Sequence, residues 1–188
     1  MALVSIAELF DMVIMTLGVG FIFMDSFFPA HHQQYDPIKK YTQFDWHALL
    51  FAALVTAPAV IFHELAHKFV AISIGLQATF HAAYMWLGIG LLLKVLNTGF
   101  IFFVPGYVST VGATQLQHAI IAFVGPFFNL VLFCTAWLVL QYQPKLKQRA
   151  QIFWVLTKRI NGFLFIFNMI PIPGFDGSHV FRGLFQLF

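Results

Sequence analysis

The sequence is poor in charged residues. Lys, Arg, Asp and Glu together make up 9% of the 188 residues, whereas a typical soluble domain carries about 25%. So few charges cannot cover the water-exposed surface of a chain that is 60% hydrophobic. Apolar runs of roughly 20 residues are typical of membrane spans, and several occur here. The composition therefore argues against a soluble protein and predicts a polytopic α-helical membrane protein.

Cysteine and basic runs are equally scarce. The single cysteine, Cys134, excludes an internal disulfide and a metal cluster built from cysteines. The net charge of +3 comes without a long basic run, so it favours contact with anionic lipid headgroups and argues against nucleic acid as a partner. The N-terminus lacks the basic region and cleavage site of a signal peptide. We therefore take it as the start of the first span.

The apolar segments predict the fold class. We expect one membrane-embedded domain, residues 1–188, with an all-α polytopic architecture of about four transmembrane helices. The four apolar runs cover about residues 12–28, 46–75, 118–140 and 152–169. Pro58 lies inside the second run and is a possible kink.

Three shorter segments complete this prediction. The apolar stretch 82–96 is interrupted by glycines and Lys94 and is short for a span, which predicts a re-entrant or extra short helix. Residues 100–110 are aromatic and β-branched around Pro105-Gly106, which predicts a small β-hairpin or a loop at the membrane edge. The tail, residues 178–188, predicts a short amphipathic helix.

The second apolar run contains His63-Glu64-Leu65-Ala66-His67. Residues four apart on a helix lie on the same face, so both imidazoles can bind one metal ion. Glu64 lies beside them and can act as a general base on a water molecule. A chance match is common for short motifs in soluble helices. Inside an apolar span it is a weak explanation, because each ionisable group there is costly and usually functional.

Scarcity of acids points to the third metal ligand. The chain has only two glutamates, Glu8 and Glu64, so a downstream glutamate ligand is absent. Asp176 is the only acid after Glu64, and it follows two helix-breaking prolines. We therefore predict His63, His67 and Asp176 as the ligand set. Taken alone, Asp176 would be interpreted as a capping residue of the tail helix.

Several other histidines in the sequence are interpreted as residues without a catalytic role. His179 follows Asp176 by three residues and could support the metal site or compete as a ligand, but an interfacial position is the preferred interpretation. His81 and His118 are also predicted to lie at the membrane interface. His31 and His32 are predicted to lie in a solvated loop.

Three motifs in order resemble the site-2 proteases, a family of intramembrane zinc metalloproteases. These motifs are His63-Glu64-x-x-His67, Gly125-Pro126-x-x-Asn129 and Asn168-x-x-Pro171-x-Pro173-x-x-Asp176-Gly177. The resemblance covers about residues 46–177, the expected catalytic core. It implies one Zn²⁺ per chain, Glu64 as general base, and cleavage of membrane-anchored protein substrates within or close to the lipid bilayer. The expected location is a multi-pass position in a prokaryotic plasma membrane.

The resemblance also implies roles for other residues. Asn129 would lie near the metal, where it could donate to the oxyanion or hold the substrate strand, although interhelical packing is its default role. Asn168 either contacts the substrate or pins the proline-containing turn. Pro105 and Gly106 lie in the segment expected to bind substrate by strand addition, and a hairpin without that role is an equal alternative.

Two other functions stay open at this point. His pairs and an aspartate would also suit a metal transporter or sensor, although a glutamate between the two histidines has no obvious use in transport. A catalytically inactive scaffold is the other possibility, and the intact triplet argues against it. The chain carries no PDZ or CBS domain, and the 82–96 insertion is longer than the minimal family pattern. The ligand set of two histidines and one carboxylate suits zinc and also iron(II).

Overall fold

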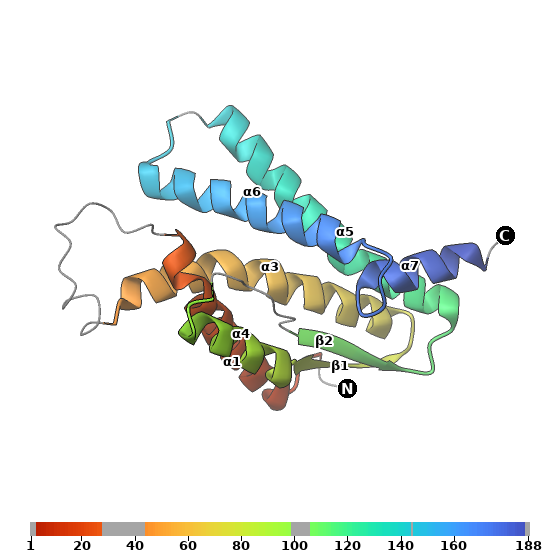
Figure 1. Ribbon diagram of the computed structural model, residues 1–188. Helices are drawn as coiled ribbons and strands as arrows, with labels where there is room; N and C mark the ends of the chain where they lie inside the picture. The colour runs from red at the N-terminus through yellow and green to blue at the C-terminus, as the bar shows by residue number, and fades with distance from the viewer. Residues whose placement is uncertain (1–2, 28–43, 99–105, 144, 187–188) are drawn as a thin grey trace.

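The structure is a computed structural model that describes residues 3–27, 44–98, 106–143 and 145–186. A central helix, α3 (Trp46–Ser73), contacts α1 (Ile6–Phe27) and α5 (Gln115–Tyr142). Helix α6 (Gln148–Asn168) packs against α5. Figure 1 shows α1 on one side of α3, and the α5–α6 pair on the other. Both neighbours of α3 can therefore supply partners to its buried polar residues.

Local signals set the ends of the two longest helices. Asp45 caps α3, accepting a hydrogen bond from the Ala48 backbone N–H at 2.9 Å. Thr114 and Gln117 form a reciprocal capping box at the start of α5. Helix α3 continues through Pro58 to Ser73, so its length carries the histidine pair well inside the helix.

Three helices in the described part of the chain are long and apolar enough to cross a membrane: α1, α3 and α5. Large apolar side chains on their outer faces, such as Phe10, Leu50 and Phe127, are exposed, as expected for contact with lipid. Helix α6, the fourth predicted span, is not among the three; it carries Arg149 in its first turn and Lys158 and Arg159 at its middle. The membrane character of the fold is supported, and the fourth span stays a prediction.

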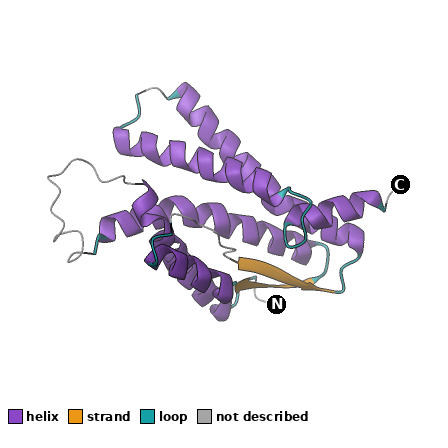
Figure 2. Ribbon diagram, viewed as in Figure 1, coloured by secondary structure: helices purple, strands orange, loops and turns teal. Residues whose placement is uncertain are grey.

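A two-stranded sheet lies beside α3 (Figure 2). Strand β1 (Gln77–Ala82) pairs antiparallel with β2 (Gly106–Val111), with Ala82 opposite Gly106. Between them lies α4 (Tyr84–Val95), a helix of 12 residues that matches the predicted short helix. The predicted small sheet is present, and the partner of β2 precedes α4, outside the segment 100–110 in which the hairpin was expected. A local pattern cannot reveal such a pairing, and Pro105 lies outside the described residues.

The chain turns sharply between α6 and α7 (Asp176–Phe185). Gly174 has φ +99°, a conformation that favours glycine. A Cβ on Gly177 would lie 2.5 Å from the Met169 carbonyl oxygen, so only glycine lets α7 start so close to the end of α6. The tail helix was predicted over 178–188, and it begins earlier, at Asp176. This turn brings Asp176 back toward α3.

Candidate metal centre

Helix α3 places the two histidines one turn apart on the side that faces α5. Their Nε2 atoms lie 3.1 Å apart, and the rings meet nearly at right angles. His63, Glu64 and His67 are each only 6% exposed. The helical spacing therefore brings two imidazole nitrogens close together in the buried part of the molecule, as the sequence predicted.

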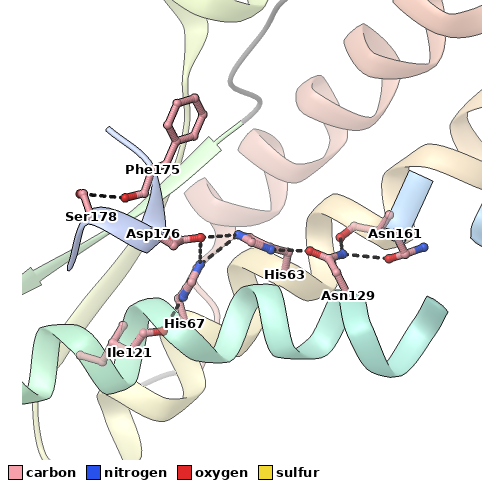
Figure 3. A network of polar contacts seen from close by, with 9 residues as sticks. His63, His67, Ile121, Asn129, Asn161, Phe175, Asp176 and Ser178 are labelled. Carbon is pink, nitrogen blue, oxygen red and sulfur yellow. Dashed lines mark hydrogen bonds and ion pairs between the residues drawn. The ribbon is translucent and has the colours of Figure 1, made fainter. Parts of the chain in front are cut away.

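Asp176 completes the group from a distant part of the chain. As the first residue of α7, it places Oδ2 3.1 Å from His63 Nε2 and 3.5 Å from His67 Nε2. Figure 3 shows the carboxylate pointing between the two rings. The structure thus brings together the three residues that the sequence indicated as metal ligands.

The partners of the outer ring nitrogens show how this group fits a cation. His63 Nδ1 lies 2.6 Å from Asn129 Oδ1, and His67 Nδ1 lies 2.6 Å from the Ile121 carbonyl oxygen. Both partners are acceptors, so each Nδ1 carries a proton and Nε2 is the nitrogen left to bind a metal ion. Two Nε2 atoms and a carboxylate oxygen face one another, an arrangement that a bound cation would stabilise.

The distances suit zinc. A tetrahedral Zn²⁺ with ligands at about 2.0–2.1 Å holds its ligand atoms roughly 3.3 Å apart, and the three separations here are 3.1, 3.1 and 3.5 Å. Gly125 on α5 faces the group closely. A Cβ at this position would collide with the His67 ring and lie 2.8 Å from His63 Nε2. A glycine is therefore required where α5 passes the imidazoles.

The three ligand residues open onto a cavity of about 430 Å³. Glu64 lines it beside them. Five consecutive β2 residues, Gly106 to Thr110, form another wall, and the end of α6 and the start of α7 close the cavity. The cavity therefore joins the metal-ligand group, an acidic side chain and a strand.

A protein of Methanocaldococcus jannaschii that is named a putative zinc metalloprotease is 31% identical to the chain over 180 residues. The alignment covers 93% of this chain and 83% of that protein. The chain belongs to this zinc metalloprotease family. No model of a known protein family matches the chain, and no solved structure matches it.

Membership of a zinc metalloprotease family agrees with the donor set. Two histidines and a carboxylate alone would also suit iron(II), so it is the zinc metalloprotease relative that favours zinc. The metalloprotease therefore has a ligand set that fits its metal, a glutamate beside it and room for a substrate.

Asn129 lies behind the metal-ligand group and not in the cavity. It is fully buried, with an exposed fraction of 0%. Its Oδ1 accepts from His63, and its Nδ2 donates to the Ala59 carbonyl oxygen at 3.0 Å and to Asn161 Oδ1 at 2.8 Å. With both N–H groups engaged in this way, the side chain of Asn129 orients His63 in this structure. Its expected role toward an oxyanion or a substrate strand stays a prediction.

The predicted substrate contacts divide into two groups. Asn168, the last residue of α6, and Gly106, the first of β2, both line the cavity. Gly106 packs so closely on Phe80 that a Cβ would lie 2.7 Å from that ring. Pro105, the third of these residues, lies outside the described part of the chain.

The cavity also includes two histidines that were predicted to be interfacial. His118 on α5 and His179 on α7 line it together, with ring centroids 5.8 Å apart. Partial desolvation, with His118 nearby, lowers the pKa of His179. His81 instead contacts Tyr107 on the sheet. His31 and His32 lie outside the described residues.

Sequence reasoning missed two buried polar pairs next to this site. On the α1 side, Lys68, the residue after His67, donates to Glu8, which also accepts the Phe80 backbone N–H at 2.8 Å. On the α6 side, Asn161 is 1% exposed and holds Asn129. The signal that could have found them is the same in both cases: a polar side chain within an apolar helix needs a partner.

Proposed function

We propose that the chain is an intramembrane metalloprotease that hydrolyses peptide bonds in membrane-anchored proteins, as site-2 proteases do. The observation that carries the proposal is the cavity in which the predicted zinc ligands, Glu64 and an available strand meet. The zinc metalloprotease relative supports the hydrolytic chemistry. The apolar exposed faces of α1, α3 and α5 support its placement within the bilayer.

The residues that would hold the zinc are His63, His67 and Asp176. When bound there, zinc would supply a Lewis acid that polarises the scissile carbonyl and makes a water molecule more acidic. Glu64 takes a proton from that water with its carboxylate and then delivers it to the nitrogen of the leaving amine. Burial of Glu64 in the same cavity keeps this proton transfer away from bulk water.

Strand β2 is the proposed substrate platform. A transmembrane helix must unwind before its peptide bond can reach the site, and its freed N–H and C=O groups then need partners. Among the described residues, β2 pairs with β1 only, and Gly106 to Thr110 line the cavity. A substrate strand added along β2 would gain backbone hydrogen bonds and lie beside Glu64.

The alternatives are weaker on this structure. A zinc transporter needs a path of ligands across the membrane. Within the described residues, only the set on α3 and α7 brings three metal-binding side chains together. An inactive scaffold would not require Glu64 beside that set.

The decisive experiment compares wild type with Glu64→Gln in liposomes that contain a single-span substrate. Zinc content is measured in both proteins, and cleavage is followed over time. We expect about one zinc per chain in each, and a loss of cleavage of roughly 10²–10⁴-fold in the variant, the size of a general-base contribution.

Two controls separate the outcomes. A soluble peptide with the same scissile sequence tests whether the substrate must be in the membrane, and zinc flux into empty liposomes tests transport. Equal cleavage by both proteins would refute the role of Glu64. Zinc flux without cleavage would refute the proposed protease function and support a zinc transporter.

A further inference from the structure

A chain of amide hydrogen bonds runs from the metal-ligand group into α6. Asn129 Nδ2 donates to Asn161 Oδ1 at 2.8 Å, and Asn161 Nδ2 donates to the Thr157 carbonyl oxygen, also at 2.8 Å. Figure 3 shows His63, Asn129 and Asn161 in line, from α3 through α5 to α6. Both amides are essentially excluded from solvent, at 0% and 1% exposure. Neither can therefore exchange its partners for bulk water.

Two backbone carbonyls fix the direction of this chain. A carbonyl oxygen can only accept, so Thr157 requires the nitrogen of Asn161 and leaves the oxygen of Asn161 for Asn129. Asn161 Oδ1 and the Ala59 carbonyl together require the nitrogen of Asn129 on their side. The oxygen of Asn129 must then face His63. A flipped Asn129 amide would set its oxygen against two acceptors in a buried site.

The amide direction decides the tautomer of a predicted ligand. Because Asn129 presents an oxygen 2.6 Å from His63 Nδ1, that nitrogen must carry the proton. In the neutral ring that binds a metal, Nε2 is then the unprotonated nitrogen, and Nε2 is the atom that faces His67 and Asp176. A ligating histidine binds through its unprotonated nitrogen, and the partner of its other nitrogen sets the tautomer.

We propose that Asn161 is a positioning residue for the metal centre, holding Asn129 in the orientation that makes His63 Nε2 a metal ligand. It touches neither metal nor substrate and acts through Asn129. The inference rests on the metal-binding part of the proposed function and is independent of proteolysis.

The test is the zinc affinity of Asn161→Leu, which keeps the branched shape of the side chain and removes the acceptor. Zinc affinity is measured by chelator competition in detergent, and the absorption spectrum of the cobalt-loaded protein reports ligand geometry. Loss of a partner behind a ligating histidine typically costs 10–100-fold in metal affinity. Because Asn161 is one step further away and Ala59 still holds Asn129, we expect about 10-fold weaker binding and a changed cobalt spectrum.

Thr56→Val is the matched control. Thr56 is a buried polar residue of α3, and its hydroxyl donates to the Ala52 carbonyl, away from the amide chain. We expect zinc affinity and the cobalt spectrum to stay those of wild type. The double variant Asn129→Leu/Asn161→Leu gives the second test. If Asn161 acts through Asn129, the double variant binds zinc no more weakly than Asn129→Leu alone.

The opposite results would overturn the proposal. A purely structural Asn161 would lower the thermal stability of the metal-free protein and leave zinc affinity unchanged, or would add its full effect in the double variant. If Asn161→Leu does not accumulate, Asn161→Ala makes the same comparison. A wild-type protein that binds no zinc would instead defeat the proposed function, so the two failures are distinguishable.

Discussion

Two buried polar networks hold the central helix α3, and they differ in charge. On the α5–α6 side, His63 is held by neutral amides, Asn129 and Asn161. On the α1 side, the next residue after His67 is Lys68, which forms an ion pair with Glu8. Both networks lie in the buried interior, but only the charged one also reaches the sheet, through the Phe80 backbone N–H.

The difference indicates what each network does. Neutral amides carry direction, because their donors and acceptors are distinct, and so they can set the tautomer of an adjacent histidine. A buried ion pair carries no such information, and its main energetic property is the cost of leaving one partner alone. The amide side therefore orients a ligand, and the charged side fastens α1, α3 and β1 together. Substitutions on the two sides should have different readouts.

The largest effect is expected on the charged side. Lys68→Met leaves Glu8 buried without its cation, and breaking a buried pair costs about 3–5 kcal/mol. The matched variant Glu8→Gln/Lys68→Met keeps an acceptor for the Phe80 N–H without the charge, so most of that loss should be recovered. Denaturation in detergent measures both. A double variant no more stable than Lys68→Met would show that the unpaired charge is not the cause.

A smaller effect on stability, with a direct effect on zinc, is expected at Gly125. In Gly125→Ala the new methyl collides with the ligand imidazoles, and overpacking of this kind costs about 1–3 kcal/mol. Zinc affinity should fall together with stability. Gly88→Ala is the control, because a Cβ at Gly88 on α4 meets no atom within 4 Å. Unchanged zinc affinity in Gly125→Ala would contradict the close approach of α5 to the histidines.

The smallest effect is expected at the end of the amide chain. Asn161 uses the backbone carbonyl of Thr157, while the Thr157 hydroxyl is buried and has no hydrogen-bond partner in the described part of the structure. Thr157→Val should therefore change the thermal stability by less than the equivalent of about 1 kcal/mol, or increase it. A large loss of stability would show that the hydroxyl has a structural role after all.

The metal-ligand group was the part of the site most accessible from sequence. The spacing of His63 and His67 follows from the helical period, and Asp176 was the only acid left in the chain after Glu64. The role of Asn129 was not accessible, because its neighbours depend on how α5 packs against α3 and α6. The same holds for Glu8 and Lys68, which are 60 residues apart.

The fold, like the site, was predictable from the sequence only in part. Long apolar runs predicted α3 and α5 to within a few residues, whereas α1 begins at Ile6, earlier than the run predicted from residue 12. A small sheet was predicted but its partner strand was not, since the partner of β2 precedes α4 and the local pattern around Pro105-Gly106 suggested a nearby turn. Pairing between distant strands depends on tertiary packing, which short-range patterns do not encode.

The sharp turn at Gly174 and Gly177 has one more consequence. Both imidazoles belong to the central helix, whereas the carboxylate belongs to α7, which the turn folds back over the cavity. An ion bound by all three would act as a reversible cross-link between the middle of the chain and its C-terminal segment. Metal loading and the docking of α7 would then be a single thermodynamic event, in which each stabilises the other.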